Sequence, residues 1–544
     1  MLMIEDIVNV AYEYIVSVSE EKDLLLAKSV LAAICQCGEE CIKEKKHADL
    51  SYEDAQSILS KMNEKESIRR SKGVYYTPVD VVEFIVSNCI KILYGRLAKE
   101  NITELDMSDI PYIDFCKERK AFDPTCGAGE FLLFALKLKF DIWDKNGKQA
   151  DRDDIEQIVS TIHGNDVNRE SIIITKLRLY LLAVQKYGVQ RCRGLANILN
   201  SCFTSNDYVL NPSTEEYDII IGNPPYVEDG KSGLELKEKY GNIYANVLVN
   251  AAINMKENGA FGFIIPLSYI STPRMKRLRE TLRGFVSSQY ILNYSDRPDC
   301  LFSSVHQKLS ILLCKKGKTD NKVYTGNYRY WYKEERIKLF TNTSVILNRY
   351  VSDDYIPKLG NRVDERIYEK VVNNNIGTSL NDYSNGRGTN YAFVNMRAAF
   401  WIKAFRKKHK GSEYKQFGFD ESRKADYFIC IMNSSLFWWF WVCVSDCWHI
   451  TKKELAVFRV PVIEDYSDVE RLAAMLENKL EETKLFVGTV QTDYEYKHKN
   501  CTDEIHAIDD YISRLYDLTD EENKYIKEFA YKYRVSGGAI NEGD

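Results

Sequence analysis

An amide and an aromatic ring directly follow an apolar run near the middle of this chain. The run, residues 217–221, is typical of a buried parallel strand, and Gly222 with two prolines ends it. The residues presented beyond the run are Asn223, Pro224, Pro225 and Tyr226. Open α/β sheets bind ligands at the carboxyl ends of their strands, so this segment is expected to face a ligand.

These residue types suit the methylation of a planar exocyclic amine, such as the amino group of adenine. The lone pair of that nitrogen is delocalised into the ring, which makes it a poor nucleophile. The Asn223 side-chain carbonyl and the Pro224 backbone carbonyl could accept hydrogen bonds from the two amine hydrogens. Tyr226 offers a ring face for stacking, worth about 1–3 kcal/mol per base. The rate acceleration is then expected to come mainly from the orientation of the reacting groups, rather than from a strong base or a metal.

A second segment has the composition of a loop that approaches a ligand closely. Residues 123–131 read Asp-Pro-Thr-Cys-Gly-Ala-Gly-Glu-Phe and join a short apolar run to an apolar helix. Small residues at such a turn let the backbone contact a bound molecule. A dinucleotide-binding loop would read Gly-x-Gly-x-x-Gly, whereas the acid-Pro-x-x-Gly-x-Gly form favours S-adenosylmethionine. We therefore expect cofactor contacts from Asp123, Pro124, Thr125, Cys126, Gly127 and Gly129.

Two acids that follow later apolar runs extend the expected cofactor site. Asp166 and Val167 end a second strand, where a carboxylate could bind ribose hydroxyls. Asp207 and Tyr208 follow an expected third strand, residues 198–203, and this carboxylate could accept a hydrogen bond from an adenine amine. A solvent-exposed turn explains the third segment equally well.

A further loop lies upstream of the cofactor segment. Tyr76, Thr77 and Pro78 precede a helix rich in Val and Ile. Thr77 is expected to be the N-cap of that helix, with Pro78 at its first position. The loop could close over the methionine end of the cofactor.

The elements that must position these loops divide the chain into four parts. Residues 67–320 alternate apolar strands with helical patterns, which predicts an α/β fold with a doubly wound, mostly parallel sheet. Residues 1–66 form a helical N-terminal region by periodicity, and residues 461–544 a helical C-terminal region. Residues 321–460 are richer in Tyr, Trp, Asn and basic residues and lack regular alternation.

The charge of the chain is distributed unevenly. The net charge is −5, yet residues 271–460 contain 33 Lys and Arg against 18 Asp and Glu, a net of +15. The rest of the chain then carries −20. This asymmetry indicates a surface for a phosphate backbone, with a solvated surface domain as the alternative.

Taken in order, these segments resemble the gamma class of DNA adenine-N6 methyltransferases from restriction–modification systems. The matching segments are Tyr-Tyr-Thr-Pro at 75–78, residues 123–131, Asn-Asp-Val-Asn at 165–168, Asn-Asp at 206–207 and Asn-Pro-Pro-Tyr at 223–226. The resemblance implies a seven-stranded methyltransferase sheet, S-adenosylmethionine as cofactor, and a flipped-out adenine as target. In this family the first four segments bind the cofactor, with Asn223 also near it, and the fifth binds the base.

The resemblance also implies residues that contact DNA. Phe302 matches the position of an aromatic that presses on the edge of the target base while Tyr226 stacks on its face. Residues 321–460 correspond to an α+β target-recognition domain. We expect phosphate contacts from Lys403, Arg406, Lys407, Lys408 and Lys410, with Arg387 and Arg397 as weaker candidates.

Other functions remain open at this stage. Asn-Pro-Pro-Tyr also occurs in RNA base methyltransferases and in enzymes that methylate a glutamine side chain, and a DNA-binding modification subunit that needs a partner is a further alternative. The basic, aromatic segment after the catalytic part favours double-stranded DNA. A cognate restriction endonuclease or specificity subunit is the expected protein partner. The sequence contains neither a signal peptide nor a membrane span and shows no metal-ligand spacing, so we expect a cytoplasmic, metal-free enzyme.

Overall fold

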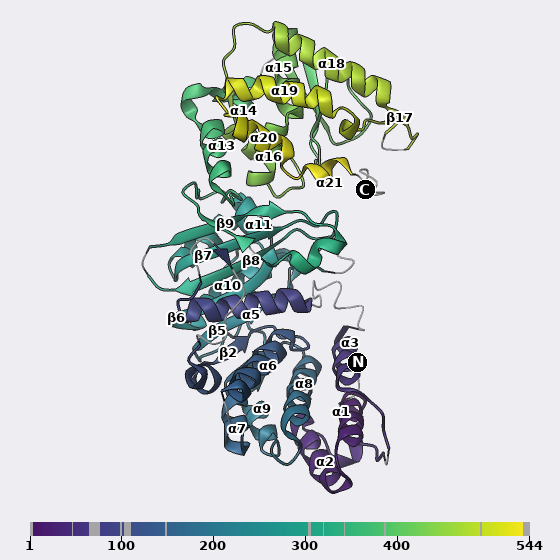
Figure 1. Ribbon diagram of the computed structural model, residues 1–544, viewed down its shortest axis with the longest axis vertical. Helices are drawn as coiled ribbons and strands as arrows, with labels where there is room; N and C mark the ends of the chain where they lie inside the picture. The colour runs from purple at the N-terminus through teal and green to yellow at the C-terminus, as the bar shows by residue number, and fades with distance from the viewer. Residues whose placement is uncertain are drawn as a thin grey trace.

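The computed structural model describes residues 4–45, 47–64, 77–97, 101–102, 110–146, 149–302, 306–318, 320–341, 343–385, 388–489 and 492–536. The molecule is elongated, with the N-terminal helices at one end, a large sheet in the middle and a mixed body of helices and short strands at the other end (Figure 1). We call the N-terminal helices together with the large sheet the catalytic body. The mixed body of helices and short strands, residues 350–536, is the recognition body.

Nine strands of the described residues form one sheet. Their order is β11 (Ile346–Leu347), β9 (Lys322–Arg329), β7 (Val286–Tyr294), β8 (Leu309–Lys316), β6 (Met255–Pro266), β5 (Tyr217–Gly222), β2 (Ala121–Asp123), β3 (Ile162–Asn165) and β4 (Phe203–Thr204). Strand β8 runs antiparallel to β6 and β7, and β11 is antiparallel to β9. The remaining pairs are parallel. The predicted doubly wound, mostly parallel fold is confirmed.

The sheet is wider than the seven strands expected. The seven strands from β7 to β4 correspond to the predicted sheet, and β9 and β11 extend it beyond β7. The expected domain boundary at residue 320 therefore falls between two strands of one sheet, because β9 pairs with β7 through backbone hydrogen bonds. Tyr290 and Tyr324 stack across this pair with ring centroids 4.7 Å apart.

Both faces of the sheet are covered. Strand β5 is buried throughout; Ile219 and Ile221 point into the core shared with the N-terminal helices, and Ile220 points into the opposite core. This alternation follows from the two-residue period of a strand. The first core contains α1 (Ile4–Val18), α2 (Glu21–Cys35), α3 (Tyr52–Glu64), α5 (Val79–Leu93), α6 (Glu130–Lys145), α7 (Arg152–Val159), α8 (Arg169–Tyr187) and α9 (Leu195–Cys202). The N-terminal helices are thus part of the catalytic body rather than an appendage.

The opposite core continues from the sheet into the recognition body. On the sheet it is covered by α10 (Ile243–Asn254), α11 (Ser268–Ser271) and α12 (Lys276–Arg283).

The predicted third strand, residues 198–203, is wrong for most of its length. Residues 195–202 form helix α9 and only Phe203 and Thr204 are extended, because a short apolar run fits a buried helix as well as a strand.

The recognition body is built on a three-stranded antiparallel sheet of β13 (Asn390–Asn395), β14 (Lys403–Phe405) and β15 (Tyr414–Phe419). Trp438, Trp439 and Trp441 are fully buried and form its core. Its helices are α13 (Arg362–Val372), α14 (Leu380–Tyr383), α15 (Ser422–Asn433), α16 (Ser435–Val444), α17 (Lys452–Val457), α18 (Ser467–Thr483), α19 (Thr502–Leu515), α20 (Asp520–Glu528) and α21 (Tyr531–Val535).

Three two-stranded pairs complete the described strands: β1 (Asn101–Ile102) with β10 (Thr343–Ser344), β12 (Gly377–Ser379) with β16 (Arg459–Pro461), and β17 (Leu485–Phe486) with β18 (Tyr494–Glu495). Over the residues described, no single helix is both long and apolar enough to span a bilayer. Helices α15 and α16 meet that length and composition only as a pair, which is bent by 60°.

Candidate active site

The expected catalytic segment lies at the carboxyl end of β5. The Asn223 side-chain amide donates a hydrogen bond to Thr77 Oγ1 at 3.1 Å. The Tyr226 hydroxyl lies 2.6 Å from Asn223 Oδ1 and 2.8 Å from the carbonyl oxygen of Ile264 on β6. The structure therefore brings Thr77 to Asn223 and Tyr226, although Thr77 lies 146 residues before Asn223 in the sequence.

Pro224 and Tyr226 lie in the part of the site where the target base is expected. Pro224 is buried, and Tyr226 is half-buried with its ring packed edge-on against Tyr244 at a centroid distance of 6.3 Å. The Tyr226 hydroxyl is within hydrogen-bonding distance of two acceptors, Asn223 Oδ1 and the Ile264 carbonyl oxygen, and uses at most one of the two lone pairs of Asn223 Oδ1.

The glycine-rich loop after β2 has the close backbone approach that the sequence suggested. Gly127 and Gly129 have φ angles of +53° and +85°. A Cβ atom at Gly129 would lie 2.6 Å from Cγ2 of Thr175, so only glycine fits there. Asp123 is buried, its carboxylate accepts a hydrogen bond from the Thr125 N–H at 3.0 Å, and burial raises its pKa well above the usual value.

Asp166 connects this loop to the end of β3. Its carboxylate accepts hydrogen bonds from the Gly127 N–H at 2.9 Å and the Asn168 N–H at 2.8 Å. Val167 beside it is 71% exposed, which is unusual for a branched apolar residue. The carboxylate and the exposed apolar side chain thus lie next to the glycine-rich loop.

Asn165, the first residue of the segment 165–168, organises the side of the site where the cofactor is expected. Its amide nitrogen donates to the carbonyl oxygens of Pro124 at 3.0 Å and Asn206 at 2.9 Å. Its oxygen accepts from Thr204 Oγ1 at 2.8 Å and the Asn206 N–H at 3.1 Å. One buried amide therefore joins the ends of β2, β3 and β4.

Some expected cofactor residues have structural roles. Tyr208 is buried, and its hydroxyl donates to Asn254 Oδ1 at 2.8 Å, which places the ring in the core. Asp207 Oδ1 accepts from the Val209 N–H at 2.9 Å and so stabilises the turn. The Cys126 N–H donates to the Asn165 carbonyl oxygen at 2.9 Å, and burial raises the pKa of its thiol well above the usual value.

Glu130, the first residue of α6, is anchored by a buried ion pair. Arg178 Nη1 lies 2.5 Å from Glu130 Oε1 and also donates to the Ala128 carbonyl oxygen at 2.6 Å. Gln56 of α3 accepts from Arg178 Nε at 2.8 Å. The N-terminal helices thereby support the glycine-rich loop from behind.

Tyr76 lies outside the described residues. Thr77 is buried but does not cap the following helix; Pro78 occupies the N-cap position, and the helix begins at Val79. The Thr77 hydroxyl instead accepts from Asn223.

Arg336 was not identified from the sequence, yet it joins the two sides of the site. Its guanidinium contacts both carboxylate oxygens of Asp80, in the first turn of α5, at 2.8 and 3.0 Å. It also donates to the carbonyl oxygens of Cys300 and Leu301, each at 3.0 Å. These carbonyls immediately precede Phe302, which is buried at 2% exposure. Arg336 therefore fixes the Phe302 loop to the helix that follows Thr77 and Pro78.

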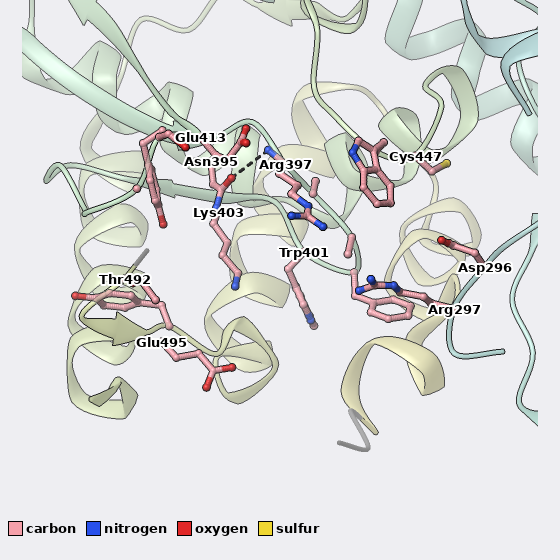
Figure 2. Close-up of a pocket in the computed structure, with 18 of the residues that line it drawn as sticks. Asp296, Arg297, Asn395, Arg397, Trp401, Lys403, Glu413, Cys447, Thr492 and Glu495 are labelled. Carbon is pink, nitrogen blue, oxygen red and sulfur yellow. Dashed lines mark hydrogen bonds between the residues drawn. The ribbon is translucent and has the colours of Figure 1, made fainter. Parts of the chain in front are cut away.

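A cleft of about 800 Å³ lies between the catalytic and recognition bodies. Figure 2 shows Asn395, Arg397 and Lys403 of the recognition body in this cleft together with Asp296 and Arg297, which follow β7. Lys410 also lines the cleft and forms an ion pair with Asp493 at 3.0 Å.

The other expected phosphate-binding residues are placed differently. Arg406 is held by Asp426 at 2.6 Å and Glu477 at 3.1 Å, so its charge is neutralised within the recognition body. We therefore no longer expect Arg406 to contact phosphate. Lys407 and Lys408 are exposed but do not line the cleft. Arg387 lies outside the described residues.

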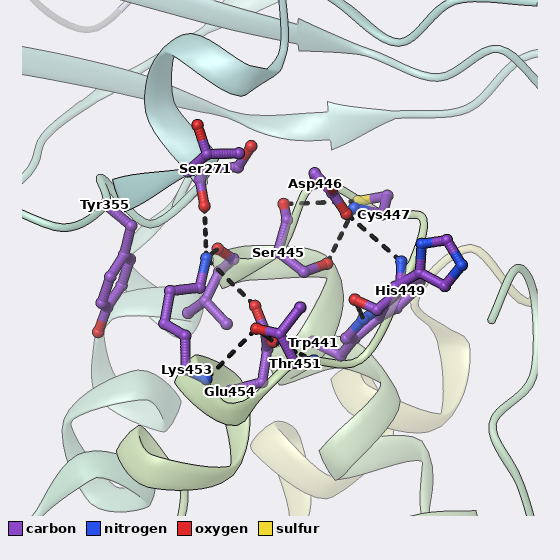
Figure 3. A network of polar contacts seen from close by, with 12 residues as sticks. Ser271, Tyr355, Trp441, Ser445, Asp446, Cys447, His449, Thr451, Lys453 and Glu454 are labelled. Carbon is purple, nitrogen blue, oxygen red and sulfur yellow. Dashed lines mark hydrogen bonds and ion pairs between the residues drawn. The ribbon is translucent and has the colours of Figure 1, made fainter. Parts of the chain in front are cut away.

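A polar network holds the two bodies together at the base of α17 (Figure 3). Lys453 Nζ donates to the Val444 carbonyl oxygen at 2.7 Å and to the carbonyl oxygen of Ser271 in the catalytic body. It also lies 3.1 Å from Glu454 Oε1. The two bodies that bound the cleft are thus connected directly by hydrogen bonds of Lys453.

Comparisons with known proteins agree with this geometry. Residues 160–299 match the family model of the Eco57I restriction-modification methylase. The type II methyltransferase M.BanIII of Aneurinibacillus aneurinilyticus is 27% identical over 247 residues, which cover 43% of this chain and 37% of that protein. M.AccI of Acinetobacter calcoaceticus is 24% identical over 260 residues, covering 42% of this chain and 48% of its own length. The chain thus aligns with less than half of each of these two relatives.

Two further matches concern the wider class and the fold. The adenine-specific methyltransferase PglX of Streptomyces coelicolor is 25% identical over 126 residues, which cover 23% of this chain and 9% of that protein. The match to the structure of the type IIL restriction-modification enzyme MmeI in complex with DNA extends over 93% of this chain and 90% of the MmeI chain. Its TM-score is 0.51, at 10% sequence identity. The resemblance to restriction–modification DNA methyltransferases is confirmed.

Proposed function

We propose that this protein transfers a methyl group from S-adenosylmethionine to the N6 amine of a flipped-out adenine in double-stranded DNA. It would supply the modification activity of a restriction–modification or phage-defence system. The observation that carries the proposal is Asn223, held by Thr77 and Tyr226 at the end of β5, one strand from the glycine-rich loop that follows β2 and two strands from Asp166 after β3. PglX, whose name states adenine specificity, supports the choice of base.

The residues around the glycine-rich loop fit the proposed cofactor. Gly127 and Gly129 adopt φ angles of +53° and +85° and present backbone without a side chain, Asp166 offers a carboxylate for hydroxyl groups, and Val167 offers an exposed apolar surface for a purine. When bound, S-adenosylmethionine would supply an electrophilic methyl group on a sulfonium sulfur. Asp123, Pro124, Thr125 and Cys126 would shape the loop from behind rather than contact the cofactor through their side chains.

On the target side, Asn223 Oδ1 and the Pro224 carbonyl oxygen would accept the two hydrogens of the adenine amine. The Tyr226 hydroxyl now beside Asn223 Oδ1 would give way, and the ring would stack on the base. Two fixed acceptors favour a tetrahedral nitrogen and so free its lone pair for the new N–C bond. Because the acceptors are positioned before the base arrives, the reaction gains from orientation.

DNA would lie in the cleft between the two bodies, with Lys403 and Lys410 near its phosphates. Extruding a base costs a few kcal/mol, which backbone contacts along the cleft would offset. A cognate endonuclease or specificity subunit would complete the system.

The direct test is methyl transfer from tritiated S-adenosylmethionine to unmethylated genomic DNA, with total RNA and a protein extract in parallel. Nucleoside mass spectrometry then identifies the product. We expect N6-methyladenine in DNA alone. Label in RNA would replace the proposal by an RNA base methyltransferase, label in protein by a glutamine methyltransferase, and no label by a subunit that only binds DNA.

A further inference from the structure

A β-hairpin of the recognition body exposes a group of neighbouring apolar side chains. Its strands, β17 and β18, pair with Leu485 opposite Glu495 and Phe486 opposite Tyr494. Phe486 is 72% exposed, and Leu485, Val487 and Tyr494 are exposed as well. The other exposed large apolar side chains of the described residues lie singly along the chain. A contiguous exposed apolar group of this kind marks an interaction surface.

The hairpin holds these side chains outward on a firm base. The Tyr496 hydroxyl donates to Glu481 Oε1 of α18 at 3.0 Å, and the buried Tyr496 ring lies 5.1 Å from the ring of Phe405 in β14, centroid to centroid. Beyond β17, Gly488 has a φ of +57°, and a Cβ atom there would lie 3.1 Å from the Phe486 ring. The glycine therefore lets the ring lie over the turn, where the chain leaves most of it uncovered.

The same hairpin forms part of the wall of the cleft between the two bodies. Val487, Tyr494 and Glu495 line the cleft, and Figure 2 shows Thr492 and Glu495 there together with Lys403. Five Lys and Arg side chains line the cleft against three Asp and Glu, which leaves it net positive. The apolar hairpin thus borders a surface whose charge complements a polyanion.

Two lysines lie directly against the hairpin. Lys484 Nζ lies 4.5 Å from the centroid of the Tyr494 ring and pairs with Glu481 at 2.5 Å. Lys410 Nζ pairs with Asp493 at 3.0 Å. Cations beside exposed aromatic rings are a common combination in nucleic-acid-binding sites. Because an apolar side chain makes no hydrogen bond or ion pair with a phosphate, the hairpin is suited to contact bases rather than the DNA backbone.

We propose that the hairpin of β17 and β18 enters the major groove of a DNA duplex in the cleft, where Phe486 contacts the bases. The major groove is about 12 Å wide and admits a two-stranded β-ribbon. The minor groove, about 6 Å wide, leaves no room for two strands about 4.8 Å apart with their side chains. An apolar ring in the major groove can contact thymine methyl groups. The inference rests on the proposed function, because it takes duplex DNA as the occupant of the cleft.

The first experiment measures binding to a duplex that the wild-type protein selects from a random-sequence pool, so it does not depend on methyl transfer. Phe486→Ala is compared with Val462→Ala, which shortens an 80% exposed apolar side chain of the recognition body outside the cleft. We expect Phe486→Ala to weaken binding by about 10-fold or more, with the slope of log K against log salt unchanged because no phosphate contact is lost. Val462→Ala should bind as the wild-type protein does. Unchanged affinity in Phe486→Ala, or a smaller salt slope, would overturn the inference.

The second experiment places a photocrosslinker on the hairpin. Phe486→p-benzoylphenylalanine should crosslink to a base of the selected duplex, and Val462→p-benzoylphenylalanine should not. Dimethyl sulfate footprinting should show protection of guanine N7, in the major groove, beside the crosslinked base, and Phe486→Ala should lose this protection. Crosslinks to a second copy of the chain or to another protein in place of DNA would overturn the inference, as would protection of adenine N3 in the minor groove alone.

The inference and the proposed function fail separately. A wild-type protein that binds duplex DNA but methylates nothing contradicts the proposed function, and the binding of Phe486→Ala still decides the role of the hairpin. A wild-type protein that methylates DNA while Phe486→Ala binds that DNA normally contradicts the inference alone. Absence of wild-type binding to any duplex contradicts both.

Discussion

Asn223 is the residue on which the proposed chemistry depends, and its oxygen is already in use. The Tyr226 hydroxyl lies 2.6 Å from Asn223 Oδ1 and 2.8 Å from the Ile264 carbonyl oxygen. The adenine amine can therefore use the second lone pair of Asn223 Oδ1 or take the place of the hydroxyl, and an exchange costs little when one hydrogen bond replaces another of similar strength. The ring of Tyr226, not its hydroxyl, would then contribute to the reaction.

Tyr226 variants separate these two contributions. Tyr226→Phe keeps the ring and should retain kcat/KM for DNA within a few-fold of the wild-type value. Tyr226→Ala removes the stacking surface and should lower kcat/KM by about 10- to 100-fold. Steady-state kinetics on one duplex measures both variants. Equal losses in the two variants would mean that the hydroxyl, rather than the ring, is required.

The sequence predicts best the features that the local backbone determines. The strand end before Asn223 and the turn at Gly127 and Gly129 are marked by neighbouring prolines or small residues, so local sequence is sufficient to predict them. The sequence does not show the contacts of Tyr208 and Arg406, because their partners are distant: Tyr208 bonds to Asn254, and Arg406 pairs with Asp426 and Glu477. A tyrosine or arginine carries no local sign of such a partner.

At the scale of the elements, the turn that carries Arg336 links helix α5, which follows Thr77 and Pro78, to the loop that precedes Phe302. Arg336→Ala should release that loop and lower kcat/KM for DNA by about 10-fold or more, since a partly buried carboxylate loses its partner. Arg336→Lys should not rescue activity, because lysine cannot form the paired contact to Asp80. Lys338→Ala, an exposed residue of the same turn, is the matched control. Identical kinetics for Arg336→Ala and the control would remove Arg336 from the site.

Lys139 of α6 gives the catalytic body a pH-dependent stability. Its buried ammonium donates to the carbonyl oxygens of Phe115 at 2.8 Å and Arg119 at 2.6 Å, and to Thr161 Oγ1 at 2.7 Å. Burial lowers its pKa to about 7. Between that value and the ordinary lysine pKa the unfolded chain binds more protons, so stability contributed by this group rises with pH.

Comparison with Lys139→Met tests this effect by denaturant unfolding at pH 7 and pH 9. The free energy of unfolding of the wild-type protein should rise by about 1–2 kcal/mol relative to the variant over that range. A difference that stays constant between pH 7 and pH 9 would show that Lys139 stays charged in the folded state.

Strand content was harder to predict at the edges of the sheet than at its centre. Strand β5 is buried on both faces, and its run of three isoleucines, Ile219 to Ile221, predicts it directly. The shorter apolar pair Ile198 and Leu199 belongs to α9 instead, and the Tyr and Asn residues of β9 resemble the recognition part, although β9 joins the large sheet. Which sheet a strand joins depends on pairing with distant residues, which local composition does not specify.

For the molecule as a whole, the cleft between the two bodies should be the main contributor to DNA binding. Lys403→Glu with Lys410→Glu changes the cleft wall, and Lys407→Glu with Lys408→Glu changes the same charge outside it. The cleft pair should weaken binding more and reduce the slope of log K against log salt by about two. An equal or larger change from the outer pair would place the DNA on another face.

The central claim is that Asn223 activates an adenine amine beside a bound cofactor, and a single-turnover comparison of the wild-type protein with Asn223→Ala tests it most directly. Methyl transfer to duplex DNA and equilibrium binding of S-adenosylmethionine are measured on the same preparations. The account predicts N6-methyladenine formation by the wild-type protein, loss of transfer by at least about 100-fold in Asn223→Ala, and cofactor affinity within a few-fold. Normal transfer by Asn223→Ala would contradict it.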